Sequence, residues 1–438
     1  MAKRHSNKSG SLESMFMRLE ELVLANSGED EFEEVFKLLI AKLYSELNNG
    51  APNFEPGATD VDTCVSIQSL LRDAQKRWPG IVEEGARSLL TNEHLHVCVG
   101  ALAPHNVSGN GLDVLDSFFE FMVSRAAKGS KGQYFTPRYV VDFCVRMLRP
   151  TSQETVLDPA CGSGGFLFHA LDYVRTTENL SGSKLEEYCG TNLWGFDIDP
   201  RAVRVAKALM ILAGDGRSNL IRLNSLLRTN MVDLLTASEQ GDLGPFTVED
   251  VLRAKRRKHK GFDVILTNPP FAGEVLERQI LDGYDASRGK QRIERDVLFI
   301  ERCIDLLRPG GRMAIVLPHN KFAANEFGAI RAWVLRRCRV LGVVGLGRNT
   351  FLPHTHQKAS ILFMQKRLVG TEDHANENIF FAVSDKDGKN SKGQLLAKAK
   401  GKEVGGQWTW VDHDLGDIAT AFAQFCIDEC IDSGELHG

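Results

Sequence analysis

The sequence has 438 residues, 43% of them hydrophobic, and a formal net charge of −4 at pH 7. This length and composition predict two or three globular domains. The net negative charge excludes an overall attraction to nucleic acid, so DNA or RNA would have to bind a local basic patch or a basic partner. The longest uncharged apolar runs fall far short of the roughly 20 residues that span a bilayer, and polar residues follow the basic start where a secretory signal needs an apolar core, so we expect a cytoplasmic protein without membrane contact.

The first part of the chain, residues 1–111, has helical patterns throughout. Apolar residues recur at i, i+3 and i+4 spacing over 30–49, and further helical patterns cover 61–76 and 82–90. The turn-rich stretch 103–111 predicts a domain boundary. This helical N-terminal domain serves either as a packing cap on the next domain or as a docking surface for a partner or DNA, and the sequence favours neither.

Residues 112–370 alternate between helical and strand patterns, which predicts an α/β domain with a doubly wound parallel sheet. About seven strands are expected, at 156–157, 193–196, 220–223, 263–267, 313–317, 340–346 and 359–364. Residues 371–438 form a C-terminal extension with a terminal helix over 415–430. That helix is either a docking element or a core-packing helix.

The first expected strand ends in the glycine-rich turn 158–166, which reads Asp-Pro-Ala-Cys-Gly-Ser-Gly-Gly-Phe. Its three glycines let a ligand approach the backbone, and the helix that begins near Gly165 would point its free N–H groups at that ligand. The turn lacks the Lys-Ser/Thr ending of the phosphate-binding loop of nucleoside triphosphatases. The second strand ends in Asp197, whose carboxylate can bind both hydroxyls of a ribose. Together these features predict a nucleoside site, with helix capping as the structural alternative for both aspartates.

The strand 262–267 ends in the motif Asn268-Pro269-Pro270-Phe271. Because ligands bind beyond the carboxyl ends of strands in an open α/β sheet, the two prolines would hold an amide and an aromatic ring against a pocket. Such a pair suits chemistry on a flat group that carries nitrogen. Taken alone, the motif is equally well explained as a rigid proline turn with a helix-capping asparagine.

Four motifs in order, at 132–137, 158–166, 195–200 and 268–271, resemble those of N6-adenine DNA methyltransferases. The pattern is most similar to the modification (M) subunit of type I restriction-modification systems, over about residues 112–367 and more loosely over the helical N-terminal part. The resemblance implies an S-adenosylmethionine-dependent methyltransferase sheet that transfers a methyl group to N6 of an adenine flipped out of double-stranded DNA.

The resemblance also implies a set of cofactor-binding residues. S-adenosylmethionine would lie over the glycine-rich turn, with Asp158 near its amino group, Asp197 on the ribose and Ile198 against the adenine. Thr136 would help to hold the methionine carboxylate, and Asn224 would offer a carbonyl oxygen to the cofactor adenine. The implied set is Gln133, Tyr134, Phe135, Thr136, Asp158, Pro159, Ala160, Gly162, Ser163, Gly164, Gly165, Asp197, Ile198 and Asn224.

The catalytic residues implied are Asn268, Pro269, Pro270 and Phe271. Phe271 would stack on the flipped base, while the Asn268 side-chain oxygen and the Pro269 carbonyl accept the hydrogens of N6 and stabilise the charge that develops there. Phe351 matches a second base-contacting aromatic, although a core phenylalanine explains it equally well. This chemistry needs no metal, and the nine cysteines contain no C-x-x-C pair that would suggest zinc.

A basic run at 253–260 precedes the catalytic strand. It is either a solvated face or a DNA phosphate contact, through Arg253, Lys255, Arg256, Arg257 and Lys258. The resemblance implies a specificity (S) subunit that selects the DNA sequence, a restriction (R) subunit that cleaves, and two copies of this chain per assembly. The rival classes are RNA or protein-glutamine N-methyltransferases, which share the Asn-Pro-Pro-aromatic turn, and a non-enzymatic scaffold. The Phe135-Thr136-Pro137 motif favours DNA.

Overall fold

The computed structural model describes residues 2–110, 112–126, 135–214, 219–228, 247–254, 261–368, 370, 377–398, 408 and 410–431. The chain forms two compact units. The first comprises Met1–Lys128 with Arg204–Gly216, and the second comprises Gly129–Val203 with Arg217–Gly438. This division falls later than the boundary expected at 111, and it assigns the end of one later helix to the first unit.

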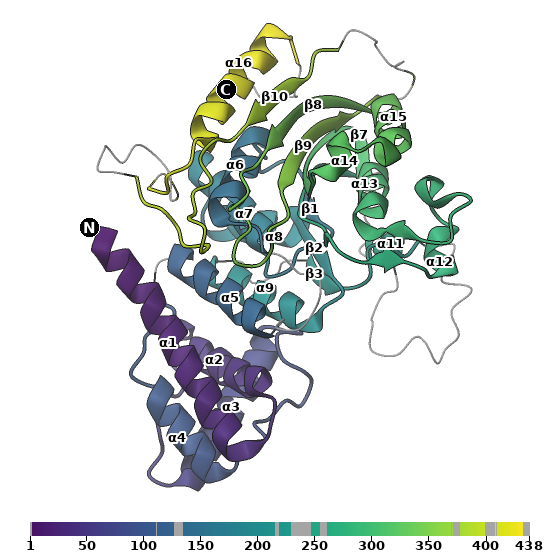
Figure 1. Cartoon of the computed structure of the whole chain (residues 1–438). Helices are drawn as coiled ribbons and strands as arrows, with labels where there is room; N and C mark the ends of the chain where they lie inside the picture. The colour runs from purple at the N-terminus through teal and green to yellow at the C-terminus, as the bar shows by residue number, and fades with distance from the viewer. Residues whose placement is uncertain are drawn as a thin grey trace. The chain divides into compact units, whose positions relative to one another are not determined.

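The first unit is helical, as predicted. It contains α1 (Ala2–Ser27), α2 (Glu31–Leu47), α3 (Asp60–Arg77), α4 (Asn92–Leu102) and α5 (Leu112–Ala126). Helix α1 packs against α2, α4 and α5 (Figure 1). Its Phe16 ring meets Phe118 of α5 edge-on at 6.0 Å between centroids. This packing explains why α5 belongs to the helical unit.

The helix predicted over 82–90 is wrong. This segment has turns and irregular backbone, and the buried carboxylate of Glu34 accepts hydrogen bonds from the Ser88 hydroxyl at 2.7 Å and the Leu89 N–H at 3.3 Å. The segment is therefore held by a tertiary contact with α2 rather than by bonds within a helix.

The second unit is built on one eight-stranded sheet, with the order β10-β8-β9-β7-β4-β1-β2-β3. All seven expected strands are present, and an eighth, β10, joins the edge beside β8. The sheet is parallel except for β9, which runs antiparallel to both β7 and β8. The strands are β1 (Val156–Asp158), β2 (Leu193–Asp197), β3 (Asn219–Arg222), β4 (Phe262–Thr267), β7 (Leu307–Pro318), β8 (Cys338–Gly345), β9 (Ala359–Lys366) and β10 (Phe380–Val383).

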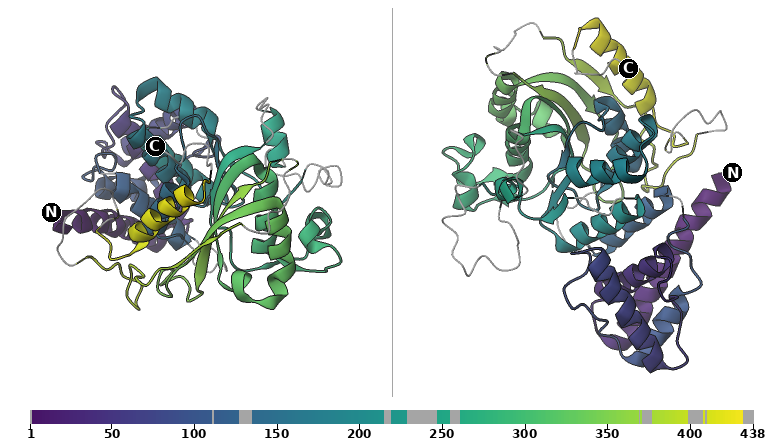
Figure 2. Two further views of the ribbon diagram at one scale, coloured as in Figure 1. Left: turned by 90° about the horizontal axis from the view of Figure 1, so that it is seen from above. Right: turned by 180° about the vertical axis from the view of Figure 1, so that it is seen from behind.

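Helices cover both faces of this sheet (Figures 1 and 2). On one face lie α6 (Arg138–Leu148), α7 (Gly165–Thr177) and α16 (Leu415–Asp428); on the other lie α13 (Arg295–Leu306) and α15 (Gly328–Arg337). The terminal helix α16 packs on α6 and β10, and its buried Phe422 lies 5.9 Å from the Phe363 ring of β9. These contacts favour the core-packing alternative for this helix.

Shorter elements complete the second unit. Strands β5 (Glu274–Val275) and β6 (Ile293–Glu294) form an antiparallel ribbon after β4. Its other elements are α8 (Gly182–Asn192), α11 (Val248–Ala254), α12 (Arg278–Leu281), η1 (Asp285–Ser287), α14 (Asn320–Ala323) and η2 (Asn325–Phe327). Helix α9 (Pro200–Leu212) begins in this unit, and from Arg204 onward it belongs to the first. Among the described helices, none combines the length and hydropathy of a membrane span.

The centre of the sheet brings three predicted functional segments together. Strand β1 lies between β2 and β4 and is parallel to both, with Asp158 opposite Gly195 and Leu157 opposite Ile265. The carboxyl ends of these strands therefore meet at one edge of the sheet, where an open α/β fold binds its ligands.

Candidate active site

The glycine-rich turn after β1 uses its glycines for two different purposes. Gly162 and Gly164 have positive φ angles of 51° and 86°, which favour glycine. Gly165 is required for space, because a Cβ there would lie 1.8 Å from Nη1 of the buried Arg138. At Gly162 a Cβ would meet nothing within 4 Å. The turn is thus open at Gly162 and closed by Arg138 at the first residue of α7.

Asp158, at the end of β1, is a buried carboxylate, with 1% of its surface exposed. Its Oδ1 accepts hydrogen bonds from the Thr267 hydroxyl at 2.7 Å and from the Ala160 N–H at 3.0 Å. Burial raises the pKa of Asp158 to about 7, against the effect of these two bonds. No cationic side chain among the described residues pairs with it, so a positively charged ligand group would meet an unneutralised acid here.

Asp197, at the end of β2, connects two turns. Its Oδ2 accepts a hydrogen bond from the Gly162 N–H and its Oδ1 accepts one from the Asp199 N–H, each at 2.9 Å. Burial raises the pKa of this carboxyl too. Gly162 precedes α7 and Asp199 precedes α9, so these two bonds join turns and do not cap a helix. Each oxygen keeps a further lone pair for a ligand hydroxyl. The neighbouring Ile198 side chain is 57% exposed and offers an apolar surface beside the carboxylate.

Asn224 lies in the loop after β3. Its side-chain oxygen, Oδ1, is the atom expected to contact the cofactor adenine. This oxygen accepts a hydrogen bond from the Leu226 N–H at 3.0 Å. This bond fixes the orientation of the amide, because only the oxygen can accept from a backbone N–H. Nδ2, a donor, is consequently the group that Asn224 directs away from its own turn.

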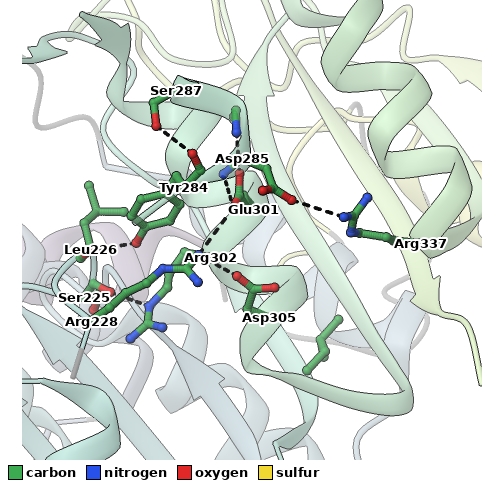
Figure 3. Close-up of polar contacts among 12 residues, drawn as sticks. Ser225, Leu226, Arg228, Tyr284, Asp285, Ser287, Glu301, Arg302, Asp305 and Arg337 are labelled. Carbon is green, nitrogen blue, oxygen red and sulfur yellow. Dashed lines mark hydrogen bonds and ion pairs between the residues drawn. The ribbon is translucent and has the colours of Figure 1, made fainter. Parts of the chain in front are cut away.

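A network of polar contacts from α13 holds this loop in place (Figure 3). The buried Arg302 donates from Nε to the Ser225 carbonyl at 2.6 Å and from Nη2 to the Leu227 carbonyl at 3.3 Å. Its Nη1 and Nη2 also bind the two carboxylate oxygens of Glu249, at 2.7 and 3.0 Å. The Ser225 hydroxyl in turn donates to the Pro159 carbonyl at 2.7 Å. The network therefore joins the loop after β3 to the glycine-rich turn.

The same network fixes the segment that follows the Asn-Pro-Pro-Phe motif. Glu301 of α13 accepts hydrogen bonds from the N–H groups of Asp285 and Ala286, both at 2.8 Å. The Tyr284 hydroxyl donates to the Leu226 carbonyl at 2.8 Å, and the Arg228 guanidinium lies 4.1 Å from the Tyr284 ring centroid. Two segments that flank the site thus share one support (Figure 3).

Asn268 follows β4 and contacts the motif that precedes α6. Its Nδ2 donates a hydrogen bond to the hydroxyl of the buried Thr136 at 2.8 Å. Pro269 is buried and Pro270 is partly buried. The structure therefore brings together two motifs that are 132 residues apart in the sequence.

Two aromatic pairs lie beside this motif. Phe271, 9% exposed, meets Phe351 edge-on with 5.7 Å between ring centroids, and Phe351 is 1% exposed. Phe135 meets His354 in a similar way at 5.9 Å. The position of Phe351 agrees with the core-packing alternative, in which it supports the Phe271 ring.

Several predicted residues lie outside the described residues. Gln133, Tyr134 and the basic residues 255–258 are among them, and Arg253 is described only as part of the backbone of α11. Ala160 and Ser163 lie in the turn as predicted, with Ser163 buried.

Sequence reasoning missed four supporting residues: Thr267, which contacts Asp158, and Arg138, Ser225 and Arg302. Three of them, Thr267, Arg138 and Ser225, are next in sequence to a motif or loop residue that was already identified. This position in the sequence was the signal that could have found them. Arg302 carried no such signal, because it lies in the middle of a helix.

The arrangement suits a ligand with an adenosyl group and an ammonium group. The exposed Ile198 and the Asp197 carboxylate adjoin each other, as binding of a base and its ribose requires. The buried, unneutralised Asp158 suits a cation. The backbone at Gly162, whose N–H binds Asp197, is open to a ligand, since a Cβ there would meet no atom within 4 Å.

Solved structures share this fold, which is that of the class I S-adenosylmethionine-dependent methyltransferases. A type I restriction-modification system methyltransferase subunit from Streptococcus thermophilus has a TM-score of 0.60 and 16% identity, and the match covers 95% of this chain and 93% of that chain. A Listeria monocytogenes protein described as a class I S-adenosylmethionine-dependent methyltransferase has a TM-score of 0.55 and 13% identity, with 86% and 92% covered.

A family model described as N-6 DNA methylase matches residues 110–427. The chain therefore belongs to the N-6 DNA methylase family. Its sequence is 29% identical to the Type I restriction enzyme EcoEI methylase subunit of Escherichia coli, over 57% of this chain and 46% of the relative. It is 27% identical to the StySJI methylase subunit of Salmonella typhimurium, over 62% of this chain and 47% of the relative. The matched region thus spans about half the length of these relatives.

Proposed function

We propose that this chain transfers a methyl group from S-adenosylmethionine to N6 of an adenine flipped out of double-stranded DNA, as the modification subunit of a type I restriction-modification system. The observation that carries the proposal is the meeting of Asp158, Asp197 and Asn268 at the carboxyl ends of adjacent strands. The proposed cofactor residues and the Asn-Pro-Pro-Phe motif thus share one edge of the sheet, which supports the proposal. Family membership and the similarity to methylase subunits support the same reaction.

When bound, S-adenosylmethionine supplies a methyl group activated by its sulfonium. Asp158 would accept from the ammonium group of the methionine part, and Asp197 would accept from the ribose hydroxyls through the lone pairs that Gly162 and Asp199 leave free. Ile198 would cover one face of the adenine. Asn224 would donate from Nδ2 to a ring nitrogen of that adenine, since its oxygen is engaged by Leu226.

The target adenine would stack on Phe271, whose ring is held edge-on by Phe351. Its N6 lone pair is delocalised into the purine, so the nitrogen is a poor nucleophile until it becomes tetrahedral. The Asn268 side-chain oxygen and the Pro269 carbonyl would accept the two N6 hydrogens. They would stabilise the positive charge that develops on N6 as it bonds to the methyl carbon and the bond from that carbon to the cofactor sulfur breaks. One of these protons leaves afterwards to solvent. The Asn268 side chain and the Pro269 carbonyl would thus act as preorganised dipoles and not as a general base.

The partners are part of the proposal. A specificity subunit would select the DNA sequence, a restriction subunit would carry out cleavage, and two copies of this chain would act per assembly. A solved structure with this fold comes from work on complex assembly of a type I restriction-modification system, which supports partners of this class.

The test is mass spectrometry of nucleosides from DNA incubated with this chain, a specificity subunit and S-adenosylmethionine, beside an Asn268→Ala control. We expect N6-methyladenine with the native chain and none with the control, although the control still binds cofactor. Cofactor binding without N6-methyladenine would refute DNA adenine methylation, and RNA and protein substrates should then be examined.

A further inference from the structure

The hydrogen bond between Asn268 and Thr136 joins the two motifs nearest to the proposed reaction. Asn268 Nδ2 donates to Thr136 Oγ1 at 2.8 Å, and Thr136 is 7% exposed. The bond is partly buried, so water competes with it less than with a surface contact. The Nδ2 end of the Asn268 amide faces the hydroxyl.

The orientation of this amide decides whether the site can assist methyl transfer. The two ends of a primary amide have nearly the same shape but opposite hydrogen-bonding character. With the oxygen toward the target, the side chain accepts an N6 hydrogen; with the nitrogen toward the target, it presents a donor to a group that must also donate. A threonine hydroxyl can donate as well as accept, so it fixes the amide only when its own hydrogen is committed elsewhere, as it would be to the methionine carboxylate of the cofactor. Thr136 would then present only lone pairs to Asn268 and remove this ambiguity before the target base binds, which is the preorganisation that electrostatic catalysis needs.

The backbone around Thr136 gives it the rigidity that such a role requires. Thr136 precedes Pro137, the N-cap of α6, and the first turn of this helix is closed by bonds from the Val140 and Val141 N–H groups to the Pro137 carbonyl, at 2.8 and 3.1 Å. Helix α6 packs on β4, the strand that ends next to Asn268. Both partners of the bond are therefore anchored to the same helix–strand pair.

We propose that Thr136 is a positioning residue for methyl transfer: its hydroxyl accepts the Asn268 Nδ2–H and holds the amide with Oδ1 toward N6 of the target adenine. This inference rests on the proposed function. It adds a second role to the contact with the methionine carboxylate, and the two roles are compatible, because a hydroxyl that accepts from Asn268 still has its own hydrogen to donate.

The two roles predict different kinetics, and Thr136→Val separates them, because valine keeps the shape of threonine but lacks the hydroxyl. If Thr136 positions Asn268, the single-turnover methylation rate at saturating cofactor falls about tenfold, the equivalent of one net hydrogen bond. A change in the Kd for S-adenosylmethionine reports the separate contact with the methionine carboxylate. Thr136→Ser keeps the hydroxyl and should restore the rate to within about threefold of the native value.

The matched control is Thr155→Val. Thr155 is also buried in the second unit and its hydroxyl donates to Asp263 at 2.7 Å, but it precedes β1 at the opposite end of the same strands. It should lower the melting temperature without lowering the saturated rate. Should Thr136→Val fold poorly, Thr136→Ala is measured with the same expectation.

The inference is overturned if Thr136→Val weakens cofactor binding but leaves the saturated rate unchanged, since Thr136 would then only hold cofactor. It is also overturned if serine fails to restore the rate. Failure of the proposed function is a different result, because the native chain itself would then make no N6-methyladenine. All rates are measured on the full chain with its specificity subunit.

Discussion

Replacing Asp158 with asparagine should abolish a pH dependence of cofactor affinity that the native chain shows below neutrality. The carboxyl is 1% exposed and its pKa is raised to about 7. In the proposed complex it binds the ammonium group of S-adenosylmethionine, and only the ionised carboxylate can do so favourably. Cofactor binding should therefore compete with protonation of Asp158.

The magnitude follows from the pKa. If only the ionised form binds, the apparent Kd scales as one plus the ratio of protonated to ionised carboxyl. Between pH 7 and pH 5.5 this factor rises by about fifteenfold for a pKa near 7. The cofactor amine remains mostly protonated over this range, because α-amino groups titrate near pH 7.7 to 8.0.

The assay is calorimetric titration of the chain with S-adenosylmethionine from pH 5.5 to 7, in two buffers of different ionisation enthalpy. The native chain should release close to one proton per cofactor bound at the acid end of this range. Asp158→Asn should bind more weakly at pH 7 but release no proton. Asp142→Asn, at an exposed ion pair with Arg146 on α6, is the control and should behave like the native chain. A native Kd that does not change with pH, with no proton release, would refute the placement of Asp158 against the ammonium group.

Two other substitutions test the supports of the site. Arg302→Leu removes the donors that hold the Ser225 and Leu227 carbonyls, so we expect a loss of about 2 to 4 kcal/mol in the free energy of unfolding by urea denaturation; a loss below about 0.5 kcal/mol would contradict the role of this network. Phe351→Ala should cost about 3 to 5 kcal/mol by leaving a cavity against Phe271. Phe271→Ala, by contrast, should chiefly reduce the fluorescence rise of a 2-aminopurine target base. If Phe351→Ala reduced this fluorescence rise more than Phe271→Ala does, Phe351 would be the stacking residue.

The sequence predicted the sheet well because its strands are short, buried and sharply bounded. Each of the seven expected strands is present, and three of them end in motifs whose residue types already indicate chemistry. The antiparallel direction of β9 was not predicted, and residues 379–381 indicated a short strand but not its place beside β8 at the edge of the sheet, since neither direction nor order in a sheet has a local signal. The helix expected over 82–90 failed for a related reason: Glu34, distant in sequence, supplies the bonds that this backbone needs.

The candidate site shows the same limit at the level of single atoms. Asn224 was correctly identified as lying in the loop after the third strand, but the bond from Leu226 to its oxygen could not be read from residue types. Likewise, the contact between Thr136 and Asn268 depends on how α6 packs against β4. Residue identity therefore predicts which groups gather at the strand ends, while tertiary packing decides which atom each group presents.

Asp158 also links the proposed function to the stability of the fold. Because its pKa in the folded chain, about 7, lies above the usual value of about 3.9 in an unfolded chain, the neutral carboxyl stabilises the fold; this contribution is fully present below about pH 4 and is lost as the pH rises through about 7. Asparagine imitates the neutral carboxyl at every pH. The free energy of unfolding of the unliganded native chain should therefore fall relative to that of Asp158→Asn between pH 5 and 8, by at most about 1.4 kcal/mol per pH unit, in urea titrations at matched ionic strength. Saturating S-adenosylmethionine should reverse this trend, because its ammonium group compensates the buried charge. If the difference in the free energy of unfolding between the two chains stays constant with pH, ionisation of Asp158 does not destabilise the unliganded fold. Burial of Asp158 would then not favour the binding of a cation.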